Sequence, residues 1–413
     1  MTKPILPGRR LTLAAILSLL AAPMVRVADA AERGARRAPP HHPAAPAAPP
    51  PPATPAETPI GPVDTTATWA YIEDYTTHAR LLTKEGDTQM PPSSMTKLMT
   101  LYIVYERLAS GKLALTDTLP VSARAWRMGG SKMFVEVGTN VSVRDLISGI
   151  IVDSGNDACI VLAEGIDGSE AQFVDEMNAT AKRLGLTGSH FVNCTGLPDP
   201  GHYMTCHDIA RLAWHIIHDF PQYYKFDEQK TFRYSNIEQE NRNPLVQRGT
   251  ADGLKTGHTD AGGYGLVASA DRNGRRVIVV LNGMPSMRQR AEQGERLMDW
   301  AFANFENVTL FTAGDVIERA PVWLGTAETV PLVGGRDLIL TLPRDWRRNA
   351  KIEVQYDAPV RAPISRGDTL GKLVISGSDV PAMTLPLLAG ADVPRLGLPG
   401  RALAVLAHYV TGG

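Results

Sequence analysis

Three short motifs of hydroxyl, lysine and amide side chains follow one another along this chain. They are Ser94-x-x-Lys97, Ser154-Gly155-Asn156 and Lys255-Thr256-Gly257. Each has an ordinary structural explanation by itself, because Ser-Gly-Asn is a common turn and Lys-Thr-Gly a common strand edge. Each is the only plausible match in the sequence, however, and all three in this order are hard to obtain by accident. We therefore expect a fold that brings these distant segments to one site.

The first motif places a lysine among apolar neighbours. Met95, Leu98 and Met99 surround Lys97, which predicts a helix over residues 95–108 with a buried face. A lysine near a core costs free energy unless the site uses it, although solvated helix faces carry lysines routinely. Ser94 lies one helical turn before Lys97, on the same face. A serine hydroxyl is a weak nucleophile and needs such an adjacent base.

The residue pattern predicts an α+β domain over residues 65–308. Further helices are expected over residues 143–153, 157–165, 173–184, 206–218 and 287–305. Strand-like runs at 263–270 and 275–283 are joined by a turn that contains Asn273-Gly274, which is typical of a β-hairpin. Helices first, then an antiparallel hairpin and a closing helix, indicate a helical cluster packed on a mainly antiparallel sheet.

After residue 308 the pattern changes to short strands. Runs at residues 337–342, 351–356 and 371–376 are bounded by Gly, Pro and Asp. They predict a small all-β domain, a β-sandwich, over residues 309–388. This domain carries no catalytic constellation, so a spacer or a binding module is expected. The tail at 389–413 is expected to form an amphipathic helix with an apolar face, too short to span a bilayer. That face is made by Leu403, Leu406, Tyr409 and Val410.

The first 64 residues have the features of an exported protein with a spacer. Basic residues precede an apolar run, and a small-residue site ends at Ala30, which predicts a cleaved signal peptide over residues 1–30. An uncleaved anchor is the alternative. Residues 31–64 are rich in Pro and Ala and are expected to form a disordered linker.

Charge and histidine content narrow the function classes. The net charge of −1 over 413 residues, with no basic run among aromatics, argues against a nucleic-acid partner. His207, His215 and His218 lie at near-helical spacing, but no carboxylate-bearing metal motif accompanies them. No metal site is therefore expected.

The three cysteines form no Cys-x-x-Cys pair, so a structural zinc site is not expected either. Cys159 falls inside an apolar helix and is expected to be a buried free thiol. Cys194 and Cys206 flank a loop rich in Gly and Pro. Whether these two pair in an oxidising compartment is left open by the sequence.

The ordered motifs resemble those of the D-alanyl-D-alanine carboxypeptidases, low-molecular-mass penicillin-binding proteins of the bacterial cell envelope. Segments at residues 193–205, 241–245 and 252–270 also look like that family, as does the β domain. The resemblance spans about residues 65–388 and implies a penicillin-binding/β-lactamase-like fold. It also implies a location in the periplasm, peripheral on the outer face of the cytoplasmic membrane.

The reaction implied by this resemblance is removal of the terminal D-alanine from peptidoglycan stem peptides through an acyl-enzyme, without metal or organic cofactor. β-Lactam antibiotics would act as covalent inhibitors. Ser94 would be the nucleophile, Lys97 its base and Ser154 the proton relay to the leaving amine. The implied substrate-binding residues are Asn156, Lys255, Thr256, Gly257, His258 and Arg290. Lys255 would also be a second cation that lowers the pKa of Lys97, and the nearby Arg288 leaves the choice of Arg290 open.

Other functions remain open at this point. A class A β-lactamase has the same fold, but it carries Ser-Asp-Asn and a Glu-x-x-Leu-Asn segment, and no such segment lies between Asn156 and Lys255. An endopeptidase that cleaves cross-links would use the same three motifs. A catalytically silent scaffold that binds peptidoglycan through the β domain is an alternative of another class. Turnover of a D-Ala-D-Ala peptide would separate the enzyme from the scaffold.

Overall fold

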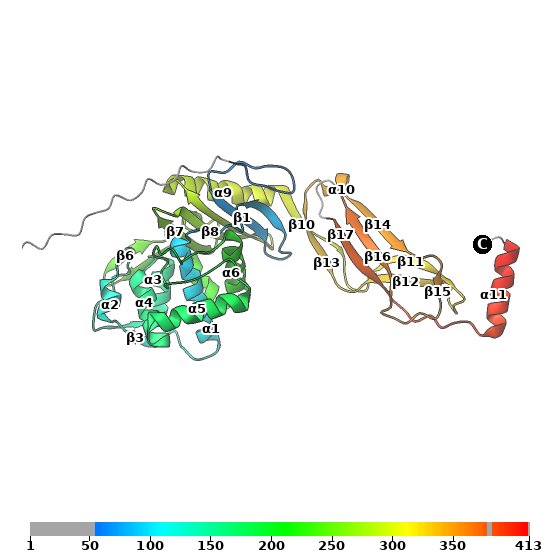
Figure 1. Cartoon of the computed structure of the whole chain (residues 1–413), viewed down its shortest axis with the longest axis horizontal. Coiled ribbons are helices and arrows are strands. Elements are labelled where there is room, and N and C mark those ends of the chain that lie inside the picture. The colour runs from blue at the N-terminus through cyan, green and yellow to red at the C-terminus, as the bar shows by residue number, and fades with distance from the viewer. Residues whose placement is uncertain (1–53, 378–381, 412–413) are drawn as a thin grey trace, which may run out of the picture. The chain divides into compact units, whose positions relative to one another are not determined.

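The computed structural model describes residues 54–377 and 382–411. The expected signal peptide at residues 1–30 and the expected linker as far as residue 53 lie outside these described residues. Two parts follow along the described chain, an α+β domain and a small all-β domain (Figure 1). Both agree with the fold class that the sequence predicts.

An antiparallel sheet of five strands forms the centre of the α+β domain. Its order is β2-β1-β9-β8-β7. The strands are β1 (Trp69–Asp74), β2 (Arg80–Lys84), β7 (Gly253–Thr259), β8 (Gly263–Arg272) and β9 (Arg275–Met284). Asn273 and Gly274 both have positive φ, at 56° and 80°, and they join β8 to β9 in the tight hairpin expected from the Asn-Gly pair.

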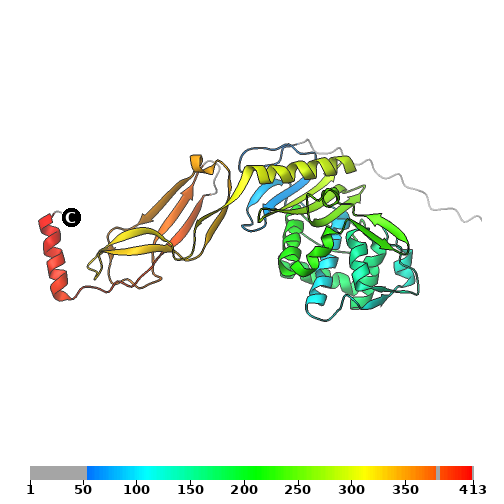
Figure 2. The same ribbon diagram turned by 180° about the vertical axis from the view of Figure 1, so that it is seen from behind.

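Helices cover both faces of this sheet. The strand residues Val267, Ile278 and Val280 share a core with the helical cluster. The alternate residues, among them Val279, pack in a second core with the long helix α9 (Met287–Asn304), because successive strand side chains point to opposite faces. Figures 1 and 2 show α9 along one face of the sheet and the cluster on the other.

The helical cluster agrees with the helices expected from periodicity. Its helices are α1 (Lys97–Ala109), preceded by the 3₁₀ turn η1 (Ser93–Thr96), α3 (Val143–Ile151), α4 (Asn156–Asp167), α5 (Glu170–Leu184) and α6 (Cys206–Asp219). Shorter elements connect them: β3 (Thr118–Pro120), α2 (Ala123–Arg127), β4 (Asn140–Ser142), α7 (Pro221–Tyr224), η2 (Lys225–Glu228), β5 (Thr231–Tyr234), β6 (Ile237–Glu240) and α8 (Pro244–Arg248). Side chains of Ser142, Ser169 and Thr205 cap α3, α5 and α6 by accepting backbone N–H groups.

The small domain is all-β apart from one short helix, α10 (Trp346–Asn349). Its strands are β10 (Phe305–Phe311), β11 (Val316–Trp323), β12 (Thr329–Gly334), β13 (Leu338–Pro343), β14 (Lys351–Tyr356), β15 (Val360–Arg361), β16 (Thr369–Ser376) and β17 (Met383–Ala389). They form a pair, β10-β13, and a six-stranded sheet. The domain has its own core, which includes Leu332, Leu373 and Leu387.

Two predicted boundaries are wrong, the end of the linker and the start of the tail. Residues 54–64 were expected to be disordered, but Ala56 is fully buried and pairs with Val63 through two backbone hydrogen bonds. Glu57 likewise exchanges backbone hydrogen bonds with Thr83 at the edge strand β2. In the tail, Val393 pairs with Ile364 of the β domain before α11 (Leu398–Thr411) begins.

All three cysteines are buried free thiols. The expectation for Cys159 is confirmed. The pairing that the sequence left open for Cys194 and Cys206 is absent, since Cys206 opens α6 and its thiol lies inside the helical core.

Candidate active site

Ser94 and Lys97 lie together at the junction of η1 and α1. Ser94 belongs to the 3₁₀ turn η1, and Lys97 is the first residue of α1. The sequence pattern placed both in one helix, and the tighter turn keeps them on one face. Lys97 Nζ lies 2.8 Å from Ser94 Oγ.

The amine of Lys97 is fully buried and makes three contacts with oxygen atoms. Besides Ser94 Oγ, Nζ contacts Asn156 Oδ1 at 2.7 Å and the Thr195 carbonyl oxygen at 2.8 Å. Nζ donates to all three oxygens here, and when the amine is neutral the two oxygens that only accept keep two N–H groups, so that the lone pair can turn to the serine hydroxyl. Burial lowers the pKa of Lys97, and the Arg242 guanidinium lowers it further. The arrangement suits a base that removes the hydroxyl proton.

The second motif lies between α3 and α4, as the sequence predicts. Ser154 has a positive φ of 59°, a strained conformation for a residue with a side chain, and it is 2% exposed. Its Oγ has no hydrogen-bond partner among the described residues. Asn156 opens α4, and its Nδ2 donates to the Gly129 carbonyl oxygen at 2.8 Å, which fixes Oδ1 toward Lys97.

The third motif occupies a strand of its own. Residues 253–259 form β7 at the edge of the sheet. Gly257 faces η1 closely, because a Cβ there would lie 3.0 Å from Ser93 Cβ and 3.1 Å from the Pro92 carbonyl oxygen. Glycine is therefore needed at this position for β7 to pack beside η1.

Lys255 and Thr256 are both buried on β7, at 2% and 4% exposure. Burial holds the pKa of Lys255 well below its usual range, and repulsion from Lys97 and Arg242 adds to this. The expected proximity of the two lysines is therefore present, with Arg242 as a third cation beside them. A site with these basic side chains is suited to a carboxylate.

Arg290, rather than Arg288, faces the interior. Arg290 is 6% exposed and donates from Nη2 to the Arg242 carbonyl oxygen at 3.1 Å. Burial lowers its pKa to about 10. Arg288 is largely exposed and pairs with Glu292 on the helix surface. The His258 side chain is exposed and lies against the Tyr264 ring, with ring centroids 4.0 Å apart and ring planes tilted by 31°.

Comparisons with known proteins give the family. The sequence profile described as D-alanyl-D-alanine carboxypeptidase matches residues 54–285. This chain belongs to that family. The profile described as the C-terminal domain of penicillin-binding protein 5 matches residues 305–395, which cover the small β domain.

Individual relatives agree with this membership. The D-alanyl-D-alanine carboxypeptidase DacA of Haemophilus influenzae is 37% identical over 338 residues, covering 80% of this chain and 86% of the relative. A solved structure of penicillin-binding protein 5 from Haemophilus influenzae has a TM-score of 0.70 and 36% identity, and the match covers 81% of this chain and 99% of the other. Penicillin-binding protein D2 of Listeria monocytogenes, solved in an ampicillin-bound form, has a TM-score of 0.53 and 30% identity over 58% of this chain and 98% of its own. The chain is thus a serine peptidase of the penicillin-binding fold.

A loop of this carboxypeptidase-family chain completes the surroundings of Lys97. Asn193 Oδ1 accepts the backbone N–H groups of Gly196 at 2.7 Å and of Thr195 and Leu197 at 3.2 Å. This turn aims the Thr195 carbonyl oxygen at Lys97. The sequence marks residues 193–205 and 241–245 as similar to the family, but it assigns no role to either segment or to Arg242.

Gly196 lets this loop lie against η1. Its φ is 83°, and a Cβ there would lie only 1.8 Å from the Ser93 carbonyl oxygen. We expect Gly196→Ala to lower the free energy of unfolding by about 2–4 kcal/mol and to slow acylation by a penicillin, because overpacking adds to the left-handed backbone penalty. Thermal unfolding and adduct formation measured by mass spectrometry check this.

Gly111→Ala is the matched control for that variant. Gly111 also has a left-handed φ of 71°, but nothing lies within 4 Å of its would-be Cβ. It should show only the backbone penalty, about 1–2 kcal/mol, with normal acylation. Equal effects of the two variants would contradict the proposed close approach.

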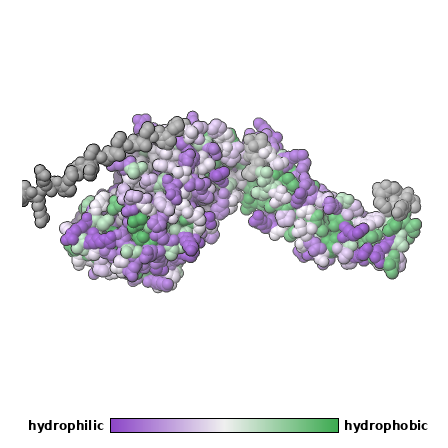
Figure 3. Space-filling view, viewed as in Figure 1, coloured by the Kyte–Doolittle hydropathy of each residue, from purple (hydrophilic) through white to green (hydrophobic). Residues whose placement is uncertain are grey.

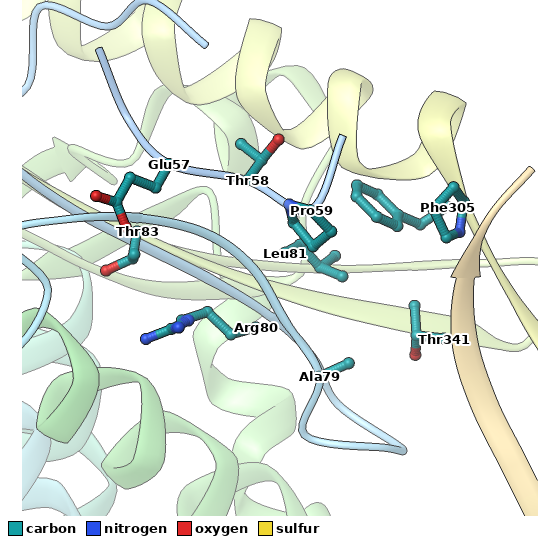
Figure 4. A pocket seen from close by; sticks show the side chains of 10 residues that line it. Glu57, Thr58, Pro59, Ala79, Arg80, Leu81, Thr83, Phe305 and Thr341 are labelled. Atoms are coloured by element: carbon teal, nitrogen blue, oxygen red, sulfur yellow. The ribbon is translucent and has the colours of Figure 1, made fainter. Parts of the chain in front are cut away.

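A separate pocket lies beside the N-terminal segment. Figure 4 shows the side chains of Glu57, Pro59, Arg80 and Leu81 among those that line it. None of the motif residues lines this pocket. It is therefore not part of the candidate active site.

Proposed function

We propose that this protein removes the terminal D-alanine from peptidoglycan stem peptides through an acyl-enzyme on Ser94. The observation that carries this is the buried Lys97 amine, 2.8 Å from Ser94 Oγ and held by two acceptor oxygens. The basic side chains of Lys255, Arg242 and Arg290 nearby support a substrate that ends in a carboxylate.

In the first half of the reaction, Lys97 accepts the Ser94 hydroxyl proton as Oγ attacks the carbonyl carbon of the D-Ala-D-Ala bond. The backbone N–H groups of Ser94 and His258 would stabilise the oxyanion, each contributing about 3–4 kcal/mol in the transition state. Lys255, Thr256 and Arg290 would hold the terminal carboxylate.

In the second half, the proton on Lys97 passes through Ser154 to the departing amine of D-alanine. The unpartnered Oγ of Ser154 is free to make this relay. Water then attacks the ester carbonyl carbon, and Lys97 passes a proton from this water to Ser94 Oγ. The bond between Oγ and the acyl group breaks, which releases the shortened peptide. Asn156 would hold the acyl side of the substrate while it keeps Lys97 in place.

The β-lactamase alternative would require a Glu-x-x-Leu-Asn segment, which does not occur between Asn156 and Lys255. Glu170 lies between the second and third motifs, but its Oε1 accepts the Cys194 backbone N–H at 3.1 Å and its other oxygen pairs with Arg124. Both carboxylate oxygens of Glu170 are therefore already engaged. A penicillin adduct should consequently clear slowly.

Endopeptidase action on cross-links remains a second candidate, because the same three motifs would serve it. One assay tests the main proposal: the purified protein is mixed with a peptide that ends in D-Ala-D-Ala, and free D-alanine is measured. Rapid turnover of penicillin would favour the β-lactamase. Release from cross-linked dimers alone would favour the endopeptidase, and no release at all would favour the silent scaffold.

We further propose that the protein is exported to the periplasm and attaches to the outer face of the cytoplasmic membrane through its tail. Among the described residues, none of the helices is long and apolar enough to cross a membrane. The helix α11 exposes Leu398, Leu403 and Leu406, at 76%, 68% and 62%, and green, hydrophobic surface is visible at this end of the chain in Figure 3. The predicted apolar face also includes Tyr409 and Val410, which lie outside the residues whose side chains are described. Apolar burial of such a helix at an interface supports weak attachment.

Deleting residues 397–413 should release most of the protein from membranes, because the exposed leucines would be lost. Fractionation of cells followed by immunoblotting measures the bound share. Leu403→Ser with Leu406→Ser in the full-length chain is the matched variant, since it keeps the helix length. An unchanged membrane-bound share in both would mean that the tail is structural.

A further inference from the structure

A buried histidine connects the loop over residues 191–204 to the turn that carries Ser94. His202 is 5% exposed, and its Nε2 lies 2.8 Å from Thr96 Oγ1, although 106 positions separate the two residues. Thr96 is fully buried in η1, between Ser94 and Lys97. The proposed catalytic pair is therefore linked, through Thr96, to a side chain that has no part in the mechanism above.

The Thr96 hydroxyl makes this distant contact in place of a local one. Thr96 directly precedes α1, a position where a hydroxyl commonly accepts a backbone N–H group of the first turn. Its backbone is helical, with φ −47° and ψ −35°, and its side chain makes no such capping bond. The hydroxyl meets the His202 ring instead. The contact thus fixes how η1 lies against the loop.

The backbone of the loop determines which ring nitrogen of His202 carries the proton. The Val192 N–H group lies 3.2 Å from Nδ1 and can only donate, so Nδ1 must accept. A neutral ring then carries its proton on Nε2 and donates it to Thr96 Oγ1. Burial lowers the pKa of His202 to about 4, the exposed Asp199 carboxylate opposes this, and His190 adds to it. The ring is therefore neutral at neutral pH.

The loop holds the His202 ring in place. Phe191 packs edge-on against it, with ring centroids 5.7 Å apart and an angle of 82° between the ring planes. The His202 backbone N–H donates to the Asp199 carbonyl oxygen at 2.9 Å. Met204, two residues on, exchanges backbone hydrogen bonds of 2.8 and 3.1 Å with Met90, in the segment before η1. A donor that is held in this way can position the hydroxyl that it contacts.

The same loop contacts α1 at two further points. The Cys194 carbonyl oxygen accepts Thr100 Oγ1 at 2.8 Å, and the Thr195 carbonyl oxygen accepts Lys97 Nζ at the same distance. Thr96 and Thr100 are four residues apart, so they lie on one face of the helical segment. The loop is thus attached to this segment on both sides of Lys97. A shift of η1 relative to the loop would move the Lys97 amine relative to its acceptor.

We propose that His202 is a positioning residue for the Ser94–Lys97 pair, which it holds by donating from Nε2 to the Thr96 hydroxyl. This inference rests on the proposed function, because it takes Ser94 as the nucleophile. The bond keeps η1 where Lys97 reaches both Ser94 Oγ and the Thr195 carbonyl oxygen. Displacing a reacting group by about 1 Å can lower the rate of the chemical step by about 10²-fold.

Two substitutions separate the two bonds of the ring. In His202→Gln the amide nitrogen reaches the place of Nε2 and can still donate to Thr96, whereas in His202→Asn the amide oxygen takes the place of Nδ1 and accepts only from Val192. In stopped-flow acylation by a chromogenic β-lactam, we expect His202→Asn to slow the acylation step about 10–10²-fold. The dissociation constant of the initial complex should not change. His202→Gln should keep most of the wild-type rate, and equal rates for the two variants overturn the proposal.

The acceptor of the bond can also be removed. Thr96→Val keeps the shape of the side chain without the hydroxyl, and it should slow acylation as much as His202→Asn does. The double variant should be no slower than either single variant, because both substitutions break the same bond. Effects that multiply in the double variant overturn the proposal. If His202→Asn does not fold, a wild-type rate for Thr96→Val overturns it.

His190→Asn is the matched control on the same segment. His190 is exposed, and its Nδ1 lies 2.7 Å from the Gly201 carbonyl oxygen of the loop. The substitution disturbs the loop without touching the bond to Thr96, so it should keep the wild-type acylation rate. A loss as large as that of His202→Asn would mean that any disturbance of the loop slows acylation, and it would overturn the proposal.

Nitrogen NMR spectra of protein labelled in its histidines give a readout that a merely structural residue would not move. The signals of His202 are identified by their absence from His202→Gln. At neutral pH they should show Nε2 protonated and Nδ1 bare, and Thr96→Val should shift the Nε2 signal. A ring that carries its proton on Nδ1, or protons on both nitrogens, overturns the proposal.

The two proposals fail in different ways. If penicillin forms no adduct on Ser94 of the wild-type protein, the proposed function is wrong. If the adduct forms and both His202→Asn and Thr96→Val acylate at the wild-type rate, only the role of His202 is wrong.

Discussion

Ser94→Ala should abolish both D-alanine release and the covalent penicillin adduct. Ser94 Oγ lies 2.8 Å from the buried Lys97 amine, and without the hydroxyl no acyl-enzyme forms. Activity should fall to the background of the assay, a loss of at least about 10³-fold. Intact-mass analysis after incubation with penicillin, together with a D-alanine assay, measures both losses.

The neighbouring serine provides the control for this result. The Ser93 hydroxyl bonds to Thr259 Oγ1 at 2.8 Å and is 1% exposed. Ser93→Ala should still form an adduct, and peptide mapping should place it on Ser94. An adduct on any other residue would rule out the mechanism.

Lys97→Met should reduce acylation by about 10²–10⁴-fold, the usual loss for a general base. The substitution replaces a buried amine by an apolar chain of similar length, which removes the desolvation penalty but leaves Asn156 Oδ1 and the Thr195 carbonyl oxygen without this donor. These effects oppose each other, so we expect a folded protein. Stopped-flow acylation by a chromogenic β-lactam gives the rate.

The pH dependence of the acylation rate distinguishes loss of the base from disturbance of the fold. A base must be neutral to act, and burial lowers the pKa of Lys97. The wild-type rate should therefore rise as pH increases through this lowered pKa and then level off. The rate of Lys97→Met should not show this rise with pH, whereas the rate of Lys182→Met, on the solvated part of α5, should show it. A Lys97→Met rate that follows the wild-type pH profile would exclude Lys97 as the base.

The motifs and the long helices could be predicted from the sequence because their signals are local. Ser94 and Lys97 are three residues apart, and the α1 and α6 helices carry clear apolar faces. The strands β1 and β2 were missed, since no turn pair such as Asn273-Gly274 marks them. Their strand character comes from pairing, for example of Tyr71 with Val280 across the sheet.

The residues missed in the site depend on contacts between distant segments. Thr195 is 98 positions from Lys97, and its carbonyl oxygen carries no residue-type signal at all. Arg242 belongs to a loop whose position is fixed by β7 and α8. The sequence also placed the end of the linker too late. Ala56 lies in a Pro/Ala-rich stretch, and only its hydrogen bonds to Val63 show that it belongs to the folded domain.

The pairing of β1 with β9 has a consequence for the order of folding. Thr68, just before β1, bonds to Gly283 at the end of β9, and these residues are 215 positions apart. Contacts of such long sequence separation require a large loop to close, which slows folding. The first strand thus waits for nearly the whole domain to be synthesised before it gains its central neighbour. A chain that stops before β9 therefore leaves β1 without the strand that pairs with it from Trp69 to Asp74.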